Sequence, residues 1–384
     1  MLSVVLDVGT DNEDLLNDEL YLGLREKRTH SGPRYDGFVD AFVKATQSLW
    51  PGVFVHFEDF GRENAARILD KYRPDVPCFN DDIQGTGCVV LASLLASIKA
   101  QNAKLKDQVF LVHGAGTAGM GIAEWVVRAL CELDGLDEAE AKKLFWLIDK
   151  QGLLFDDDED LTEHQKAYAR SRDDVKEWKD DGKFCLMDVV KQAKPTVIIG
   201  TSAQKGSWTE ELVKTMVEAA GDKKAVFLPL SNPTRLEEAT PDDIIKWSNN
   251  VCHVATGSPF EPVEFDGKTI EIGEANNALC YPCLGFATII SGAKSLSDSL
   301  ILAGVKALAD LSPLVDDPHG ALLPNLGTIR NVTVNVAMAM VRQALEDGVA
   351  TAEGIPDGKN NHELRSWIES FMWTPEYCEL ELLK

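Results

Sequence analysis

The segment VFLVHGAGTAG, residues 109–119, decides the fold: an apolar, β-branched run passes directly into a Gly-x-Gly-x-x-Gly turn. A helix is predicted to follow over residues 119–133, and its N-terminus would offer N–H groups to an anion. The first glycine permits a tight turn, the second lets the backbone approach a pyrophosphate and the third allows close helix packing. The segment therefore predicts a dinucleotide-binding turn; the alternative is a turn that binds nothing. The expected cofactor-binding residues are Gly114, Gly116, Thr117, Ala118 and Gly119.

Strands and helices are predicted to alternate along the chain around this segment. Near-continuous apolar strands separated by helices are typical of a parallel sheet that is covered on both faces. The fold class is therefore predicted to be α/β, with a doubly wound, Rossmann-like parallel sheet. The predicted strands are residues 109–113, 144–149, 196–201, 225–230 and 251–256. The predicted helices are residues 88–98, 119–133, 185–193, 209–219, 241–247, 299–310 and 331–347.

The first 82 residues lack the regular alternation of strands and helices that is predicted for the rest of the chain. SVVLD, residues 3–7, and VFVHFED, residues 53–59, predict two strands. Helices are predicted over residues 35–49 and 62–71. The helical spacing in the first of these comes from Phe38, Phe42, Val43 and Leu49.

The composition disfavours several functional classes. The 384 residues include 38 Lys and Arg against 62 Asp and Glu, and the formal net charge of −24 disfavours binding to nucleic acid or anionic membranes. No uninterrupted apolar run approaches the roughly 18 residues of a membrane span, and residues 1–10 lack the pattern of a signal peptide. Eight scattered cysteines favour reduced thiols in the cytoplasm or an organelle matrix. The pair Cys280 and Cys283 lacks the partners of a zinc site and is predicted to be structural.

Asp149 ends the strand that follows the glycine-rich turn. A carboxylate at that strand tip accepts hydrogen bonds from the ribose hydroxyls of NAD and repels the 2′-phosphate of NADP. The neighbouring Lys150 could instead pair with that phosphate. The acidic run 156–160, predicted to be a solvated loop, adds negative charge nearby in the sequence. The balance favours NAD, with NADP as the alternative.

Two carboxylate-rich segments precede the glycine-rich turn: FEDF, residues 57–60, and FNDDIQGT, residues 79–86. Adjacent carboxylates at a strand end repel one another unless a cation neutralises them. Three carboxylates with open coordination positions suit a hard divalent ion that also binds substrate oxygens. The alternative interpretation is exposed acid on the surface of an acidic protein.

Several short segments of the chain form a set: LDVGT at 6–10, FEDF at 57–60, NDDIQGT at 80–86, GAGTAG at 114–119, SNPT at 231–234, TGSPF at 256–260 and NN at 276–277. With this set the chain resembles malic enzyme, the decarboxylating malate dehydrogenase, from about residue 3 to about residue 380. It is most similar to the bacterial and fungal NAD-linked branch, through DKQG at 149–152. The resemblance implies oxidative decarboxylation of malate to pyruvate and carbon dioxide, with reduction of NAD(P) and dependence on a divalent metal.

The resemblance also implies roles for individual residues. Asp81 would be a catalytic residue that lies beside the metal and pairs with the general base. The implied ligands of Mg or Mn are Glu58, Asp59 and Asp82. The implied malate-binding residues are Asn232 and Asn277, whose amides offer a donor and an acceptor together, and the further cofactor-binding residues are Asp149, Lys150, Asn232 and Asn276. Without the resemblance, the Asn-Pro and Asn-Asn pairs would be interpreted as plain turns.

The resemblance divides the chain into parts. Residues 1–82 correspond to the C-terminal part of the malate domain, an α/β domain that is expected to be truncated here. Residues 83–350 correspond to the NAD(P)-binding domain, and residues 351–384 to a helical tail. The family forms homodimers or homotetramers, and a location in the cytoplasm or the mitochondrial matrix is expected.

Three of the family's functional positions lie upstream of the LDVGT segment: a Lys that is the general base, a Tyr that is the general acid and an Arg that grips the malate carboxylate. None has a counterpart in these 384 residues. We therefore expect this chain alone to bind NAD and metal but to turn malate over very poorly. The alternative is a non-catalytic NAD- and metal-binding protein that pairs with or regulates a full-length homologue.

Overall fold

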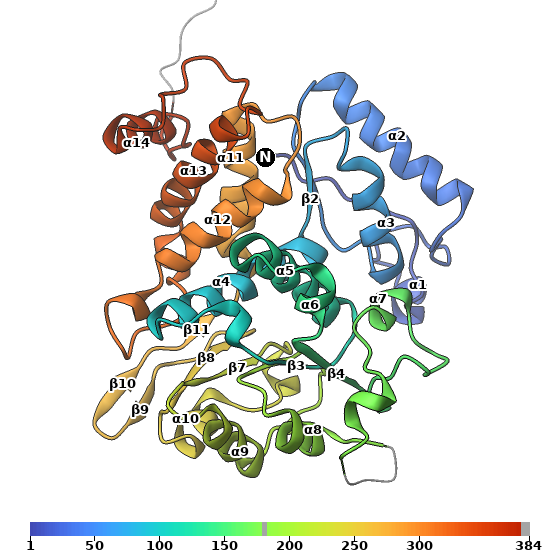
Figure 1. Ribbon diagram of the computed structural model, residues 1–384. Coiled ribbons are helices and arrows are strands. Elements are labelled where there is room, and N and C mark those ends of the chain that lie inside the picture. The colour runs from blue at the N-terminus through green and yellow to red at the C-terminus, as the bar shows by residue number, and fades with distance from the viewer. Residues whose placement is uncertain (179–182, 378–384) are drawn as a thin grey trace, which may run out of the picture.

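A seven-stranded, mostly parallel sheet forms the centre of the computed structural model, which describes residues 1–178 and 183–377. Its strand order is β11-β8-β7-β6-β3-β4-β5 (Figure 1). Neighbouring strands are parallel except for β5, which runs antiparallel to β4. The strands are β3 (Phe110–His113), β4 (Phe145–Asp149), β5 (Gly152–Leu153), β6 (Val197–Gly200), β7 (Ala225–Pro229), β8 (Cys252–Thr256) and β11 (Gly273–Glu274). The predicted Rossmann-like sheet and all of its predicted strands are confirmed.

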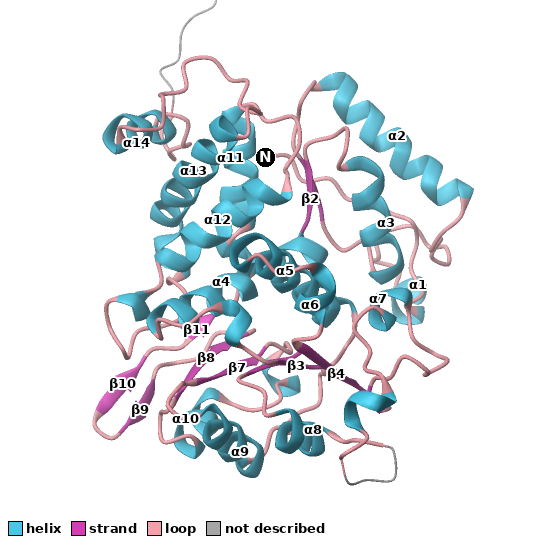
Figure 2. Ribbon diagram, viewed as in Figure 1, coloured by secondary structure: helices cyan, strands magenta, loops and turns pink. Residues whose placement is uncertain are grey.

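Helices cover both faces of this sheet (Figure 2). Phe110 and Val112 of β3 belong to the core on one face, whereas Leu111 belongs to the core on the other. Because both faces are covered, every residue of β3 is buried, which explains the unbroken apolar run in the sequence. The first face carries α4 (Thr86–Ala100), α5 (Thr117–Asp134), α11 (Tyr281–Ser291), α12 (Asp298–Asp310) and α13 (Ile329–Glu346). The second carries α8 (Leu186–Ala193), α9 (Glu210–Ala220) and α10 (Pro241–Trp247).

Helix α4 is the most deeply buried helix of the first face. Together with the π-helical turn before it, Asp81–Ala100, it is long and apolar enough to cross a membrane by length and composition alone. However, 72% of that window is buried inside the protein, where α4 contacts α5 and α12. The apolar composition of α4 is therefore explained by its place in the core.

The first part of the chain builds a smaller unit with its own core, at the upper right of Figure 1. Its two strands, β1 (Val55–Phe57) and β2 (Cys78–Asn80), are parallel, with Phe57 opposite Asn80. Its helices are α1 (Glu13–Asn17), α2 (Pro33–Leu49) and α3 (Arg62–Tyr72). The predicted strand at 53–59 and the predicted helices at 35–49 and 62–71 are confirmed, with small shifts at their ends.

The predicted strand at residues 3–7 is wrong. No described residue pairs with this segment as a strand, and Val4 and Val5 are 51% and 89% exposed. In the described part of the chain, backbone hydrogen bonds to another segment begin only after residue 7: Thr10 N donates to Glu26 O, and Thr29 N donates to Val8 O. A strand needs a partner for its N–H and C=O groups, so the apolar run alone does not produce one.

The two units are joined by an ion-pair network around Asp298, the first residue of α12. Arg73, which follows α3 in the first unit, donates to Asp298 Oδ1 (2.5 Å), and Arg128 of α5 donates to Asp298 Oδ2. One carboxylate therefore holds a guanidinium from each unit, in a partly buried setting where such bonds are strong.

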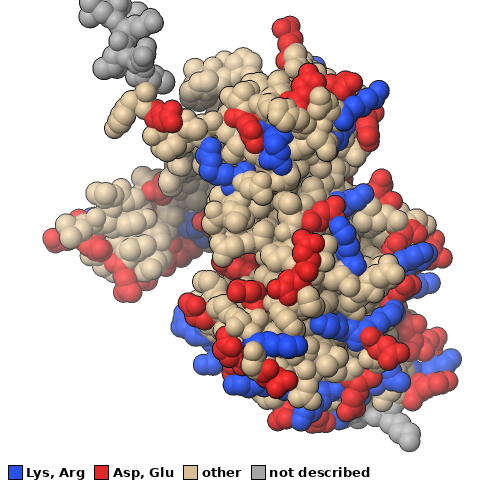
Figure 3. Space-filling model, turned by 90° about the vertical axis from the view of Figure 1, so that its left-hand side faces the viewer, with Lys and Arg blue, Asp and Glu red and all other residues tan. Residues whose placement is uncertain are grey.

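The remaining elements are short. They are the hairpin β9 (Val263–Phe265) and β10 (Lys268–Ile270), and the helices α6 (Glu138–Lys142), α7 (Glu163–Lys166) and α14 (Asn361–Glu369). Cys280 and Cys283 are buried, and Cys283 Sγ donates to the carbonyls of Leu279 and Cys280, as expected of a structural pair. The described cysteines are all free, and Cys378 lies outside the described residues. On the face drawn in Figure 3, acidic and basic side chains are interspersed.

Candidate active site at the strand ends

The predicted metal-binding carboxylates converge at one edge of the small sheet. Because β1 and β2 are parallel and in register, their carboxyl ends lie side by side. Glu58 and Asp59 follow β1 directly, and Asp82 follows β2 by two residues. One carboxylate oxygen from each of these three residues lies within 4.8 Å of the others. The structure thus brings together all three residues that the sequence analysis assigned to a metal.

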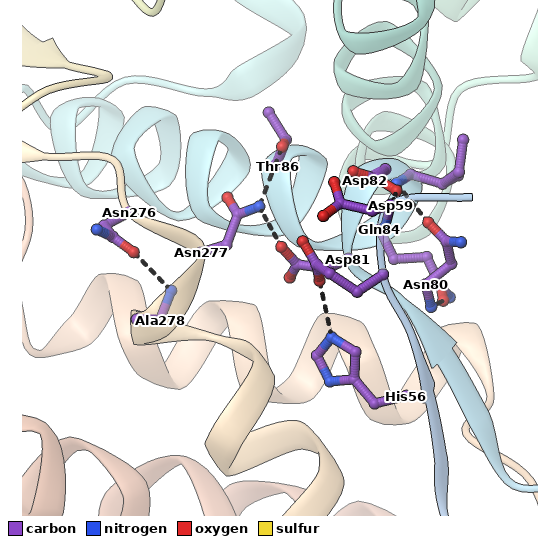
Figure 4. Close-up of polar contacts among 12 residues, drawn as sticks. His56, Asp59, Asn80, Asp81, Asp82, Gln84, Thr86, Asn276, Asn277 and Ala278 are labelled. Carbon is purple, nitrogen blue, oxygen red and sulfur yellow. Dashed lines mark hydrogen bonds and ion pairs between the residues drawn. The ribbon is translucent and has the colours of Figure 1, made fainter. Parts of the chain in front are cut away.

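Asp59 and Asp82 are also linked through the backbone. Asp59 N donates to Asp82 Oδ2 over 3.1 Å, so the turn after β1 is held against the turn after β2 (Figure 4). Asp59 has a φ of 59°, in the left-handed region that Asp and Asn adopt more readily than most residues. The bond from Asp59 N to Asp82 therefore links the two loops beside their carboxylates.

Asp81 lies behind these ligands and is 6% exposed. Its Oδ2 accepts a hydrogen bond from Asn277 Nδ2 (2.8 Å), which also donates to Thr86 Oγ1 (3.2 Å). Asp81 Oδ1 is buried without a hydrogen-bond partner among the described residues. A Cβ at Gly85 would lie 2.3 Å from that oxygen, so a glycine is needed there. A buried, unpaired carboxylate oxygen is costly unless a cation or a donor faces it.

The turn that carries Asp81 and Asp82 is held by their neighbours. It is a π-helical turn, Asp81–Gly85, that leads into α4. Asn80 is fully buried; its Oδ1 accepts from Ile83 N (3.0 Å), while its own N–H donates to Gln84 Oε1 (3.0 Å). π-Helical turns are rare and frequent at functional sites.

His56 is a site residue that the sequence analysis missed. Its Nε2 lies 3.2 Å from Glu58 Oε2, and it forms a second possible metal-binding group with Glu58 and Asp81, within 4.8 Å. The ring is held edge-on between Phe79 and Tyr281. The available signal was the two-residue period of β1, which places His56 on the same face as Glu58.

The electrostatics of the cluster favour a bound cation. Burial raises the pKa of Asp81, opposed by the Asn277 hydrogen bond. Burial, and next the charge of Asp81, raise the pKa of Glu58. Burial, and next the charge of Asp59, raise the pKa of Asp82. Oxygen ligands under mutual repulsion, beside an unpaired buried oxygen, fit a hard divalent cation such as Mg²⁺ or Mn²⁺.

The glycine-rich turn has the geometry that its sequence predicts. Gly114 has a φ of 104°, and a Cβ there would lie 2.5 Å from the backbone of Thr201. A Cβ at Gly119 would lie 2.4 Å from Gly114 O, so α5 packs closely on the turn. At Gly116 an added Cβ would meet nothing within 4 Å. Thr117 and Ala118 begin α5 and are half-buried beside this open space.

Asp149 and Lys150 lie at the end of β4, the strand beside β3 in the sheet. Asp149 is half-buried and accepts a hydrogen bond from Lys150 N (2.8 Å), whereas Lys150 is exposed. Gly114 N donates to Ile148 O (2.8 Å), so the glycine-rich turn and the tip of β4 are adjacent. This is the place that a ribose would occupy if its pyrophosphate lay on the turn.

The three predicted asparagines have different settings. Asn277 reaches Asp81, as described above. Asn276 instead caps the following 3₁₀ turn, because its Oδ1 accepts from Ala278 N (2.9 Å) while its Nδ2 donates to Glu274 (2.8 Å). Asn232 is exposed after β7 and precedes Pro233 with a cis peptide bond. Among the described residues, neither Asn276 nor Asn232 hydrogen-bonds to the acidic cluster.

The chain matches two family models along most of its length. Residues 83–345 match the malic enzyme NAD binding domain, and residues 1–73 match the malic enzyme N-terminal domain. The fold is a Rossmann-like sheet with an adjoining carboxylate cluster. The chain belongs to the malic enzyme family.

Named relatives are NAD-dependent. The chain is 45% identical to NAD-dependent malic enzyme 3 of Bacillus subtilis over 380 residues, covering 98% of this chain and 65% of that protein. It is 43% identical to the mitochondrial NAD-dependent malic enzyme of Saccharomyces cerevisiae over 390 residues, covering 98% of this chain and 57% of that protein. The chain thus spans about 65% or less of the length of these relatives.

Solved structures share the fold. The malic enzyme of Entamoeba histolytica has a TM-score of 0.65 and 22% identity, covering 87% of this chain and 63% of that one. The malic enzyme of Pyrococcus horikoshii has a TM-score of 0.63 and 23% identity, covering 86% and 70%. At this identity the likeness establishes the architecture alone.

Proposed function

We propose that this protein serves the oxidative decarboxylation of malate to pyruvate and carbon dioxide, with NAD as the hydride acceptor and Mg²⁺ or Mn²⁺ as the metal. The observation that carries the proposal is the convergence of Glu58, Asp59 and Asp82 beside the buried Asp81. These residues lie at the junction between the first unit and the cofactor-binding sheet, because Asp81 bonds to Asn277, which follows β11. Family membership supports the same reaction.

The carboxylates of Glu58, Asp59 and Asp82 would hold the cation, as they supply oxygen ligands from two loops. When bound, NAD accepts a hydride and the divalent ion polarises the substrate oxygen that loses it. His56 would orient Glu58 through its 3.2 Å contact, as partners of metal ligands commonly do.

Asp81 would act as the catalytic carboxylate beside the metal. It is buried, its pKa is raised by burial, and one of its oxygens has no described partner. Such an oxygen suits a hydrogen bond from a cationic general base. Asn277 would fix Asp81, bind malate and lie near the nicotinamide, and Asn232 would bind malate and the cofactor.

The glycine-rich turn would hold the pyrophosphate, with Gly116, Thr117 and Ala118 around the open space at the N-terminus of α5. Asp149 at the tip of β4 would hold the adenosine ribose and favour NAD over NADP. Lys150 would lie near the same ribose, and Asn276 near the nicotinamide ribose.

We also propose the wider organisation. Residues 1–82 form the C-terminal part of the malate domain, 83–350 the NAD-binding domain and 351–384 a tail that contains α14; residues 378–384 of that tail lie outside the described residues. Malate is the small-molecule partner, with neither nucleic acid nor membrane, and the protein works as a homodimer or homotetramer in the cytoplasm or the mitochondrial matrix.

The test is to incubate the protein with malate, NAD and Mn²⁺ and to quantify NADH and pyruvate. Equal amounts of the two products support the proposal, at whatever rate they form. NADH with oxaloacetate and no pyruvate would indicate a dehydrogenase without decarboxylation. If no NADH is formed in the assay, but added NADH and Mn²⁺ each bind in separate titrations, the protein is a non-catalytic binding protein.

A further inference from the structure

Glu238 is a fully buried carboxylate in the connection between β7 and α10. Its Oε1 accepts three hydrogen bonds: from Ser202 N (2.8 Å), from Ser202 Oγ (2.8 Å) and from Ser231 Oγ (2.6 Å). Ser231 Oγ in turn accepts from Ala203 N (2.9 Å). One carboxylate oxygen therefore fastens the loop after β6 to the loop after β7.

These two loops adjoin the residues that would meet the cofactor. The loop after β6 begins at Thr201, whose Oγ1 donates to Gly114 O (2.6 Å) in the glycine-rich turn. The loop after β7 includes Ser231, directly before Asn232. Parallel α/β sheets bind their ligands at the carboxyl ends of their strands, which is where both loops lie. Glu238 itself is fully buried and holds the loops from within the fold.

The space around Glu238 is shaped for a side chain of this size. A Cβ at Gly200 would lie 2.6 Å from Glu238 Cδ and Oε2, so the last residue of β6 leaves room for the carboxyl group. Ala203 has a φ of 54°, a conformation that costs free energy in a residue other than glycine. Its N–H is held by Ser231 Oγ, and Ser231 by Glu238, so the strained loop depends on this carboxylate.

We infer that Glu238 is a positioning residue for dinucleotide binding. Glu238 holds the loops after β6 and β7 at the spacing that the nicotinamide half of NAD requires. The inference rests on the proposed function, since it takes NAD as the ligand. Glu238 contributes through Ser202 and Ser231 and does not touch the cofactor. A neutral Gln keeps an acceptor oxygen at the same place, whereas Ala removes it and leaves three donors without a partner.

The experiment measures NADH binding by fluorescence and Mn²⁺ binding by electron paramagnetic resonance on the full chain. The variants are Glu238→Ala, Glu238→Gln and Ser231→Ala, with Glu237→Gln as the matched control. Glu237 is the adjacent buried carboxylate, 3% exposed, and its side-chain oxygens make no hydrogen bond to either loop among the described residues. Ser231→Ala cuts only the link between Ala203 and Glu238, so it tests the inference even if Glu238→Ala does not fold.

We expect the NADH dissociation constant to rise about tenfold in Glu238→Ala and several-fold in Ser231→Ala, as is typical when hydrogen bonds to a charged group are lost. Glu238→Gln and Glu237→Gln should stay within about threefold of the unsubstituted protein, and Mn²⁺ binding should not change in any variant. Unchanged NADH binding in both Glu238→Ala and Ser231→Ala would overturn the inference, as would an equal weakening of NADH and Mn²⁺ binding, which indicates general loss of structure. An unsubstituted chain that binds no NADH would instead overturn the proposed function, and this inference with it.

Discussion

The side chains of Asp81 and Asn277 are joined by a 2.8 Å hydrogen bond although 196 residues separate them in sequence. Asp81 follows β2 of the first unit, and Asn277 follows β11 at the edge of the large sheet. The bond therefore connects the carboxylate cluster to the cofactor-binding part of the molecule. It also satisfies one of the two oxygens of a buried carboxylate, while the other stays unpaired.

Replacement of Asn277 by Ala should destabilise the protein. Both oxygens of Asp81 would then be buried without a donor, which typically costs about 1–3 kcal/mol in the free energy of unfolding. Urea denaturation of the two proteins measures this difference. The control is Thr86→Val, which removes only the weaker contact of Asn277, at 3.2 Å, and should cost clearly less. Equal stability of Asn277→Ala and the unsubstituted protein would show that the bond contributes nothing.

Glu237 should make stability depend on pH. Burial raises the pKa of Glu237 from its usual 4.5 to about 7. Between pH 4.5 and about 7, Glu237 is deprotonated in the unfolded chain but protonated in the folded chain. The protonated group stabilises the fold at low pH, and this contribution to the free energy of unfolding is lost as the pH rises through about 7. Glu237→Gln stays neutral, so at pH 8.5 it should be more stable than the unsubstituted protein by on the order of 1–3 kcal/mol.

The advantage of Glu237→Gln should shrink when both proteins are unfolded by urea at pH 5.5. Other titrating groups are common to both proteins, so they cancel in the difference. The control is Glu261→Gln, at an exposed glutamate. If the difference between Glu237→Gln and the unsubstituted protein is the same at both pH values, the account of Glu237 is wrong.

Gly116→Ala should affect cofactor binding, whereas Gly119→Ala should affect folding. At Gly116 the backbone has a φ of −78° and an added Cβ meets nothing, so stability should change by less than about 0.5 kcal/mol. NADH binding should nevertheless weaken, since the methyl group would enter the space of the pyrophosphate. At Gly119 the added Cβ lies 2.4 Å from Gly114 O, so folding itself should suffer. Thermal unfolding and NADH titration of both variants measure this, and unchanged NADH binding in Gly116→Ala would contradict the placement of the cofactor.

Asp149→Ser should reduce the preference for NAD. A carboxylate near a 2′-phosphate repels it by about 1–4 kcal/mol at short range, depending on the effective dielectric constant. Its removal should therefore tighten NADP binding by about tenfold relative to NAD. Calorimetric titration of both cofactors gives the ratio, and Asp160→Ser, in the exposed acidic turn, is the control. An unsubstituted protein that binds NADP as tightly as NAD would reverse the proposed preference.

The large sheet could be predicted from the sequence because its strands are buried on both faces. Unbroken apolar runs such as Val197–Gly200 have few alternatives when a helix follows each one. The edge strands β5 and β11, of two residues each, were not predicted, since two residues carry no periodic signal. The apolar run at residues 3–7 shows the converse, because its pattern is that of a strand and yet it pairs with no described residue.

The sequence predicted the carboxylates of the candidate site, but it predicted neither His56 nor the contacts among these residues. Glu58, Asp59 and Asp82 were found because carboxylates clustered at strand ends, within segments that resemble a known family. The bond from Asp81 to Asn277 and the role of Glu238 depend on which distant loops meet in space, and a single sequence does not determine this. Helix α2 illustrates the same limit, since its buried residues include Tyr35 and Val39, whereas the predicted Phe38 and Leu49 are 43% and 67% exposed.

The most direct measurement is a titration of Mn²⁺ into the unsubstituted protein, Asp59→Asn and Asp75→Asn, with free Mn²⁺ followed by electron paramagnetic resonance. Asp59→Asn replaces a charged ligand by a neutral one and keeps the backbone bond from Asp59 N to Asp82. Asp75 is an exposed carboxylate of the same unit and belongs to neither possible metal-binding group. We predict one tight Mn²⁺ site in the unsubstituted protein and in Asp75→Asn, and an affinity weaker by about tenfold or more in Asp59→Asn. The same Mn²⁺ affinity in all three proteins would contradict the assignment of the metal to Glu58, Asp59 and Asp82.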